Sequence, residues 1–222
     1  MFNSLTPKVV AMIQTGVWQT IYMVAISSLL AYAIGLPLGI LLVVTDKDGI
    51  KPIGWLNKLI GIVVNIIRSI PFLIFMVAVM PLTRSIVGTT IGTKATMVPL
   101  VLAAGPFVAR MVETSFKEVD AGVVEAAQSM GATTWNIIWK VLLPEAKPSL
   151  TLGSTIAITT ILGYSAMAGF VGGGGLGAIA VNYGYNRYQD EIMLVTVVLM
   201  VILVQVIQEV GMRIARAGDK RL

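Results

Sequence analysis

Two long stretches without a charged residue limit what this chain can fold into. No charge occurs between Lys8 and Asp46, and residues 148–186 hold none in 39 positions. A helix needs about 20 apolar residues to cross the hydrocarbon core of a bilayer. Over the whole chain 56% of residues are hydrophobic and 12% are charged, against roughly 25% charged in a soluble domain. The sequence therefore predicts an all-α integral membrane protein, with residues 1–222 forming a single transmembrane domain.

The composition also excludes several functional classes. The chain has neither Cys nor His, which removes disulfides, thiol nucleophiles, imidazole bases and the usual zinc sites. Its net charge of +5 comes from Lys and Arg near the ends of apolar runs, with no basic stripe. This pattern indicates membrane topology rather than nucleic-acid binding. The N-terminus lacks the features of a cleaved signal peptide, so we expect it to remain part of a first span.

The apolar runs divide into five expected transmembrane helices, at about residues 17–45, 66–82, 95–115, 150–171 and 192–210. In the first, Gly35 and Gly39 permit close helix packing, and Pro37 between them can kink the helix. The alternative is that these residues are merely tolerated in a lipid-facing helix. The run Gly172–Gly175 is a poor helix interior and predicts a reversal of the chain on the outer side.

Five spans place the two termini on opposite sides of the membrane. With the N-terminus outside, cytoplasmic segments carry eleven Lys and Arg and outer segments carry four, leaving Arg68 uncounted. This bias follows the positive-inside rule and predicts a cytoplasmic C-terminus. The inward-facing basic residues are Lys47, Lys51, Lys58, Arg110, Lys117, Lys140, Lys147, Arg213, Arg216, Lys220 and Arg221.

Three charged residues fall in or near the expected spans. Arg68 is a functional candidate by its position, or it reaches the cytoplasmic interface by snorkelling, in which case residues 52–65 lie along the inner face. Arg110 and Glu113 are three residues apart and can form an ion pair on one helix face. A proton relay is the alternative for this pair.

The cytoplasmic loop at residues 117–149 has its own helical pattern. Residues 121–130 suit a short helix, and Gly131 falls where a left-handed cap would end it. Thr133 or Thr134 can cap a second helix, which we expect Pro144 to stop. The sequence therefore predicts a compact pair of short helices joined at a glycine.

The surface of this loop favours docking to a protein. Ala126 and Ala127 have small side chains, so a partner can approach this side of the helix closely, and Glu125 offers a carboxylate to a partner. Trp135, Ile138 and Trp139 are apolar anchors of the kind that dominate interfaces. The alternative is an amphipathic helix lying on lipid headgroups, with the two tryptophans as its aromatic belt.

The glycine-rich segment contains a misleading motif, because Gly172, Gly174 and Gly177 satisfy G-x-G-x-x-G. A dinucleotide site needs a strand before that motif, and here a membrane span precedes it. We expect a tight outer turn instead, followed by an aromatic and polar segment at residues 182–188 suited to meeting a partner protein. The chain has no phosphate-binding G-x-x-x-x-G-K-[ST] motif, so any ATP site must lie on another subunit.

The pattern of Glu125, Ala126, Ala127 and Gly131, with Leu143 and Pro144 further on, resembles the EAA loop of ABC importer permeases. The stretches NIIRSIPF (65–72), GPFVARMVE (105–113), EAAQSMGAT (125–133) and GYSAMAGFVGGGGLG (163–177) resemble the permease subunit of methionine ABC importers. The similarity covers nearly the whole chain, with Val141 as a small departure from the more usual Ile.

This resemblance implies a type I ABC importer permease fold in the bacterial inner membrane, crossing it several times. It implies a homodimer, two ATPase subunits on the cytoplasmic side and a methionine-binding lipoprotein outside. The chain would move L- and D-methionine by alternating access without being an enzyme, since ATP and Mg²⁺ would bind the partner ATPase. The alternatives are a permease of this fold for another amino acid or small solute, and an intramembrane enzyme using Glu113 or Asp190 with Glu191.

The candidate site residues form three groups. By resemblance, Met167 matches an apolar gate on the translocation path, with ordinary helix packing as the alternative. Other path candidates are the uncharged polar residues Thr160, Tyr164 and Ser165. The ATPase-coupling residues are Glu125, Ala126, Ala127, Met130, Gly131, Ala132, Trp135, Leu143 and Pro144, and the remaining candidates are Arg68, Arg110 and Glu113. We expect no metal site and no cofactor bound by this chain.

Overall fold

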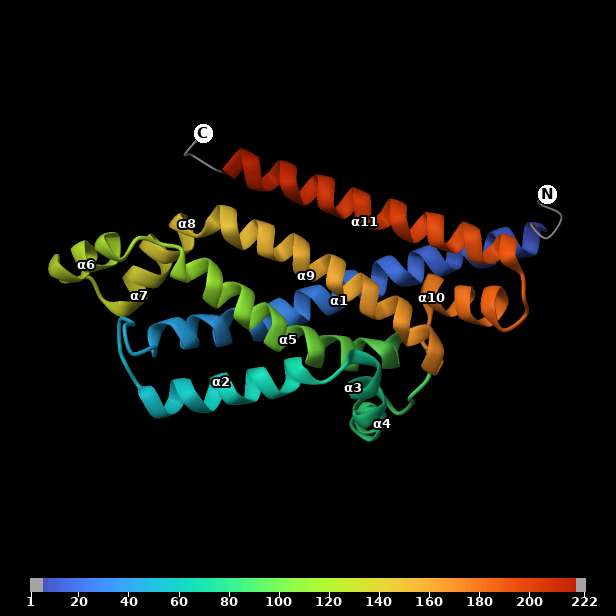
Figure 1. Cartoon of the computed structure of the whole chain (residues 1–222), viewed down its shortest axis with the longest axis horizontal. Helices are drawn as coiled ribbons and strands as arrows, with labels where there is room; N and C mark the ends of the chain where they lie inside the picture. The colour runs from blue at the N-terminus through green and yellow to red at the C-terminus, as the bar shows by residue number, and fades with distance from the viewer. Residues whose placement is uncertain (1–5, 219–222) are drawn as a thin grey trace. The chain divides into compact units, whose positions relative to one another are not determined.

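The computed structural model describes residues 6–218, and within that range its regular elements are helices, with no strand (Figure 1). The predicted all-α architecture is therefore confirmed. In chain order the elements are α1 (Pro7–Val44), α2 (Gly54–Ser69), α3 (Phe72–Ala78), α4 (Met80–Val87), α5 (Thr93–Lys117), α6 (Ala121–Ser129), α7 (Thr134–Ile137), η1 (Ile138–Leu142), α8 (Leu143–Glu145), α9 (Lys147–Met167), η2 (Ala168–Val171), α10 (Gly175–Ile179), η3 (Ala180–Tyr185) and α11 (Asp190–Gly218).

Four helical segments are long and apolar enough to cross a membrane. Among the described residues these are α1, α5, the helical run from Lys147 to Tyr185 that begins with α9, and α11. They coincide with four of the five predicted spans. All four are longer than expected: α1 begins at Pro7, α11 continues to Gly218, and the run that begins with α9 continues to Tyr185. Pro37 lies inside α1 without ending it.

The second predicted span, at residues 66–82, is wrong as a continuous helix. The chain forms α2 and α3 instead, bent by 104° at a short break, and a fifth span exists only if this bent pair is counted as one. Pro71 explains the break, because it lacks an N–H and disfavours helical geometry at the preceding Ile70. The chain then continues as α3 and α4.

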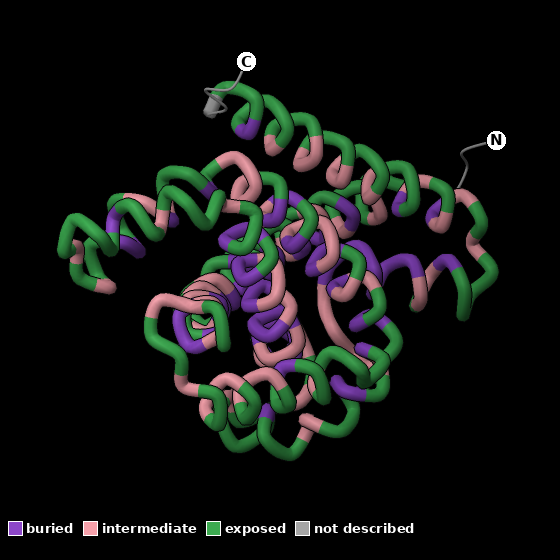
Figure 2. The backbone as a smooth tube through the Cα atoms, turned by 60° about the vertical axis from the view of Figure 1, so that its left-hand side comes forward, coloured by how far each residue is buried: buried purple, intermediate pink, exposed green. Residues whose placement is uncertain are grey.

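The chain divides into two compact units, each described here by itself. The first holds the described residues up to 30 together with 70–104 and 158–208, and the second holds 31–69, 105–157 and the described residues from 209. Buried positions are purple in Figure 2. The most deeply buried large side chains of the first unit are Met23, Leu100, Ile161, Leu176, Ile192 and Thr196, and those of the second are Leu42, Val64, Val108, Val112, Phe116 and Ile137.

Within the second unit, two glycines of α1 let this helix approach α5 closely. A Cβ atom on Gly35 would lie 2.6 Å from Val108 and 2.7 Å from the carbonyl oxygen of Gly105. A Cβ atom on Gly39 would lie 2.6 Å from Val112 and 2.7 Å from the carbonyl oxygen of Ala109. The close-packing interpretation of this pair is thus confirmed, since only glycine fits at these distances.

We expect Gly39→Ala to lower the thermal unfolding midpoint by several degrees. The new methyl group meets a backbone oxygen that cannot rotate away, and such overpacking costs about 1–3 kcal/mol, or roughly 2–12 °C for a chain of this size. Gly61→Ala is the matched control, because Gly61 is also inside a helix but its nearest neighbouring atom would be 3.8 Å away. Equal midpoints for the two variants in detergent would contradict the close-packing account.

Within the first unit, the chain reverses after α9 and returns as a second helical segment. Gly172 and Gly175 have positive φ values of 82° and 84°, which glycine adopts without steric cost. The predicted reversal is confirmed, and the preceding element is the helical turn η2 rather than a strand, so the dinucleotide interpretation fails. The sequence did not predict that residues 175–180 would form a buried helix.

Candidate functional site

The helix pair of the predicted coupling loop is built by local caps. The Asp120 carboxylate accepts a hydrogen bond from the backbone N–H of Gly122 at the start of α6 (2.7 Å). At the end of α6, Gly131 has φ 77° and its N–H donates to the Gln128 carbonyl at 2.9 Å. The N–H of Ala132 donates to the Ala127 carbonyl at 3.1 Å, which completes a Schellman motif. The predicted glycine cap is confirmed.

The second helix of the loop begins as predicted but does not end as predicted. The Thr133 hydroxyl accepts from the N–H of Asn136 at 3.3 Å and caps α7. The prediction that Pro144 stops this helix is wrong, because a π-helical turn, η1, carries the helical path into α8. Pro144 sits at the start of α8, where a proline needs no hydrogen-bond partner for its nitrogen.

The loop exposes large apolar side chains beside an exposed carboxylate. Met130, Trp135 and Trp139 are 81%, 65% and 49% exposed, and the two tryptophan rings lie 5.3 Å apart at 60°. Glu125 and Ala126 are also exposed. Exposed aromatic residues of this size are typical of surfaces that bind a partner.

The remaining residues predicted for the coupling loop differ in how far they are buried. Ala127 is buried. The prediction that Ile138 is an exposed anchor is wrong, because it is buried beside Ile137 in the loop's own core. Ala132 and Leu143 are half-buried, and Pro144 is exposed.

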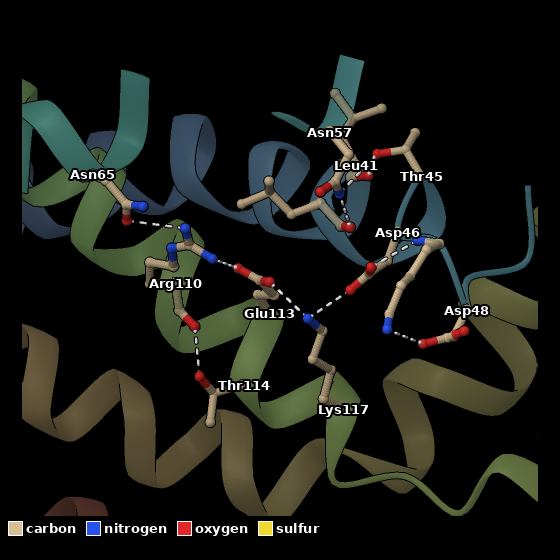
Figure 3. A network of polar contacts seen from close by, with 12 residues as sticks. Leu41, Thr45, Asp46, Asp48, Asn57, Asn65, Arg110, Glu113, Thr114 and Lys117 are labelled. Atoms are coloured by element: carbon tan, nitrogen blue, oxygen red, sulfur yellow. Dashed lines mark hydrogen bonds and ion pairs between the residues drawn. The ribbon is translucent and has the colours of Figure 1, made fainter. Parts of the chain in front are cut away.

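A network of polar side chains joins α5 to two neighbouring segments of the second unit (Figure 3). Arg110 donates to the carboxylate of Glu113 and to the Asn65 side-chain oxygen on α2 at 2.9 Å. Lys117 bridges Glu113 at 2.9 Å and Asp46 at 2.7 Å. The Arg110–Glu113 pair was predicted, whereas its extension to Lys117 and Asp46 was not. Glu113 is 7% exposed, so these cations offset the cost of burying its charge.

The Asn57 side-chain amide ties the start of α2 to the end of α1. The Asn57 side chain donates to the carbonyl oxygen of Leu42 at 2.6 Å and to the Thr45 hydroxyl at 3.2 Å. The Leu42 carbonyl is among the last of its helix, where no intrahelical donor remains. The two Asn57 hydrogen bonds and the Asp46–Lys117 pair therefore help to hold the turn between α1 and α2.

We expect Asp46→Asn to remove an acid-sensitive part of the protein's stability. The hydrogen bond from Lys117, the largest influence, lowers the pKa of Asp46 from its ordinary value. A lowered folded-state pKa stabilises the fold above the unfolded pKa of about 3.9, and this contribution is lost as the pH falls through the folded value. At pH 7 the variant should therefore melt lower, by about 2–4 °C for a contribution of about 1 kcal/mol.

Asp48→Asn is the matched control for that measurement. Asp48 is two residues away, and its side chain and that of its partner Lys47 are 84% and 85% exposed, so the pair contributes little. The difference between Asp46→Asn and the parent should shrink as the pH is lowered below about 4. A difference that persists unchanged at pH 3, or equal effects at the two positions, would contradict this account.

The predicted path residues lie at the end of α9, in the first unit. The Tyr164 ring stacks on Phe72 with centroids 4.3 Å apart and planes 4° from parallel. Met167 is 43% exposed and Thr160 is half-buried. Ser165 differs from them, because it is 2% exposed and its hydroxyl donates to the carbonyl oxygen of Leu162.

Arg68 lies in the last turn of α2 and is exposed. A cation is favourable there, since the carbonyl end of a helix carries partial negative charge. Arg68 belongs to the same unit as Arg110, but the Asn65 side chain is the group on α2 that Arg110 contacts.

The capped helix pair at residues 121–145 and the long apolar helices can now be compared with known proteins. The model of the family described as "Binding-protein-dependent transport system inner membrane component" matches residues 35–222. The chain belongs to this family. The importer-permease fold and the multi-pass location in the inner membrane are thereby confirmed.

Two relatives are similar to this chain over almost their full length. The chain is 54% identical to the probable D-methionine transport system permease protein MetI of Vibrio cholerae, covering 93% of this chain and 92% of the relative. It is 41% identical to the protein of the same description from Pasteurella multocida, covering 98% and 100%.

Two solved structures extend the comparison. A chain from the inward-facing conformations of the MetNI methionine ABC transporter superposes with a TM-score of 0.96 at 46% identity, covering 97% of this chain and all of the other. A chain from an amino acid ABC transporter crystallised with histidines gives a TM-score of 0.79 at 17% identity. This second likeness concerns the fold alone.

Proposed function

We propose that this chain is the permease subunit of an ABC importer that moves methionine across the bacterial cytoplasmic membrane. The observation that carries the proposal is the 54% identity, over 93% of the chain, to a probable D-methionine permease. Both L- and D-methionine are the proposed cargo. Transport proceeds by alternating access and is driven by ATP hydrolysis on a separate subunit, so the chain is not itself an enzyme.

The coupling loop at residues 117–149 is the proposed point of energy transfer. Glu125, Ala126, Met130 and Trp135 are exposed on it, and the caps at Gly131 and Thr133 fix its shape. The positive-inside bias orients the loop toward the cytoplasm, with the N-terminus outside. Two basic residues of that count, Lys220 and Arg221, lie outside the described residues. The excess of Lys and Arg in the cytoplasmic segments remains when these two residues are left out of the count.

The proposed assembly is a homodimer with two ATPase subunits and an external methionine-binding lipoprotein. A solved structure of the MetNI methionine ABC transporter supports the ATPase and the permease dimer. ATP and Mg²⁺ bind the ATPase in this proposal, and the permease holds no cofactor. ATP shifts the equilibrium between the two states of the transporter only if it binds one state more tightly than the other. In this proposal the coupling loop links the state of the ATPase to the positions of the transmembrane helices.

The proposed path runs past Thr160, Tyr164 and Met167 at the end of α9. Uncharged polar groups can pass a zwitterion without trapping it. Met167 is 43% exposed within the single chain, and in the proposed dimer two such side chains meet and close the passage. The Arg110–Glu113 pair belongs to the second unit and has a structural role in this account.

We expect Met167→Ala to raise ATP hydrolysis without methionine by roughly tenfold or more, since burying a Met side chain at a closed gate contributes about 1.5–3 kcal/mol. The measurement is hydrolysis by the complete transporter in lipid vesicles, together with methionine leakage. Met212→Ala is the control, because Met212 has a similar exposure of 38% but lies on α11. Unchanged coupling in Met167→Ala would refute the gate.

Uptake of radiolabelled methionine into vesicles containing the complete transporter tests the proposed cargo. Accumulation should require ATP and should be reduced by excess unlabelled L- or D-methionine. If another amino acid abolished uptake at lower concentration than either form, the alternative of a permease for a different small solute would be favoured.

A further inference from the structure

The first turn of α10 is held by two side chains of α1, within the first unit. The Gln19 side-chain oxygen accepts a hydrogen bond from the backbone N–H of Gly175 at 2.9 Å. The Thr20 hydroxyl accepts from the N–H of Leu176 at 2.9 Å and donates to the carbonyl oxygen of Gly16 at 2.9 Å. The first N–H groups of a helix have no intrahelical acceptor. Gln19 and Thr20 supply the missing partners.

The Thr20 contact is buried and the Gln19 contact is half-buried, so the Thr20 hydrogen bond is the more costly one to lose. Thr20 is 3% exposed and Leu176 is 0% exposed, so water cannot readily replace the Thr20 hydroxyl. An unsatisfied buried N–H group is far more costly than an exposed one. The two α1 side chains lie outside residues 35–222, the range matched by the family model.

α10 in turn contacts the backbone on both sides of Met167. A Cβ atom on Gly177 would overlap the backbone of Ala166, and one on Gly169 would lie 2.5 Å from the backbone of Gly177. The N–H of Gly173 also donates to the carbonyl oxygen of Ala168 at 2.9 Å. The residues before and after Met167 are therefore fixed by direct backbone packing.

We propose that Gln19 and Thr20 are positioning residues of the gate. Their side-chain oxygens accept hydrogen bonds from the first turn of α10 and hold it in place. α10 in turn packs against the backbone on either side of Met167 and so determines where the Met167 side chain lies. This inference rests on the proposed function for its role in transport, because Met167 is the gate residue there. The geometry that it predicts at residue 167 can be measured whichever solute the protein carries.

The test uses the complete transporter in lipid vesicles with Met167→Cys as the parent background. The chain has no natural cysteine, so the introduced thiol is the only one in this subunit. The rate of labelling by a membrane-impermeant maleimide is compared after adding Thr20→Val or Gln19→Leu. Each removes an acceptor at nearly constant volume, and we expect each to change the rate about tenfold.

Two matched variants separate positioning from a general effect on α1. Thr20→Ser keeps the hydroxyl and should restore the parent labelling rate. Thr15→Val removes a hydroxyl that donates to the carbonyl oxygen of Ala11 at 2.9 Å on the exposed side of the same helix. It should label like the parent. In the protein that keeps Met167, methionine transported per ATP hydrolysed should fall with Thr20→Val and remain at the parent value with Thr20→Ser.

The outcomes distinguish this inference from the proposed function. If labelling in the parent background does not respond to bound nucleotide, the gate assignment is wrong, while a tenfold effect of Thr20→Val still supports positioning. If labelling responds to nucleotide but Thr20→Val and Gln19→Leu both label like the parent, the positioning role is overturned. An equal effect of Thr15→Val would overturn it as well.

Discussion

Glu125→Arg is expected to release the ATPase from this permease and to abolish methionine uptake. The carboxylate is exposed on α6, so its replacement should leave the fold of the permease intact. Truncating or reversing a charge that a partner binds typically costs about 2–5 kcal/mol, which weakens binding by roughly 30-fold or more. Co-purification of the ATPase and its titration onto reconstituted permease measure the loss.

Asp48→Arg makes the same change of charge outside the coupling loop. The Asp48 side chain is 84% exposed, and Asp48 lies in the turn after α1. This variant should retain the ATPase and transport activity. An intact complex with full ATPase stimulation in Glu125→Arg would count against the assignment of the docking site.

Gly131→Val is expected to weaken ATPase binding through the backbone alone. Gly131 has φ 77°, and apart from its two chain neighbours no residue has an atom within 4 Å of where its Cβ would be, so a side chain there does not clash with the surrounding structure. A left-handed conformation costs an ordinary residue about 1–2 kcal/mol and costs a β-branched residue more. The strain favours loop conformations that do not bind the ATPase. The apparent Kd for the ATPase rises as the fraction of permease in the binding conformation falls, and we expect a rise of about tenfold.

Gly131→Asn separates this backbone effect from the loss of glycine itself. Asn tolerates the left-handed region far better than Val and has a similar volume. The Asn variant should bind the ATPase nearly as well as the parent. Equal losses for Asn and Val would show that the side chain, and not the backbone conformation, disturbs the interface.

The parts of the structure that sequence reasoning predicted depend on neighbours in the chain. The Gly131 cap and the Thr133 cap are set by residues within one or two helical turns. The Arg110–Glu113 pair follows from a spacing of three. The same reasoning could have extended the network to Lys117, four residues beyond Glu113. The α1 and α5 spans followed from hydropathy alone.

The parts that were missed depend on contacts between distant residues or on competing local signals. Gln19 and Gly175 are 156 positions apart, and no local pattern connects them. Asp46 reaches Lys117 only because the turn after α1 lies beside the end of α5. At Pro71 the break signal was present, but the apolar run around it suggested a continuous span. Pro144 was expected to end the helix, but a π-helical turn before it lets the helical path continue through this proline.

The side of the membrane that the coupling loop faces tests the central claim most directly. Ser129→Cys places a thiol on exposed α6, and Asn186→Cys places one on the exposed segment after η3. With a membrane-impermeant maleimide, the thiol at 129 should react in inside-out vesicles of the assembled transporter stripped of its ATPase, and the thiol at 186 in right-side-out vesicles. Labelling of position 129 from the outer side would contradict the proposal that this permease receives its energy through residues 117–149.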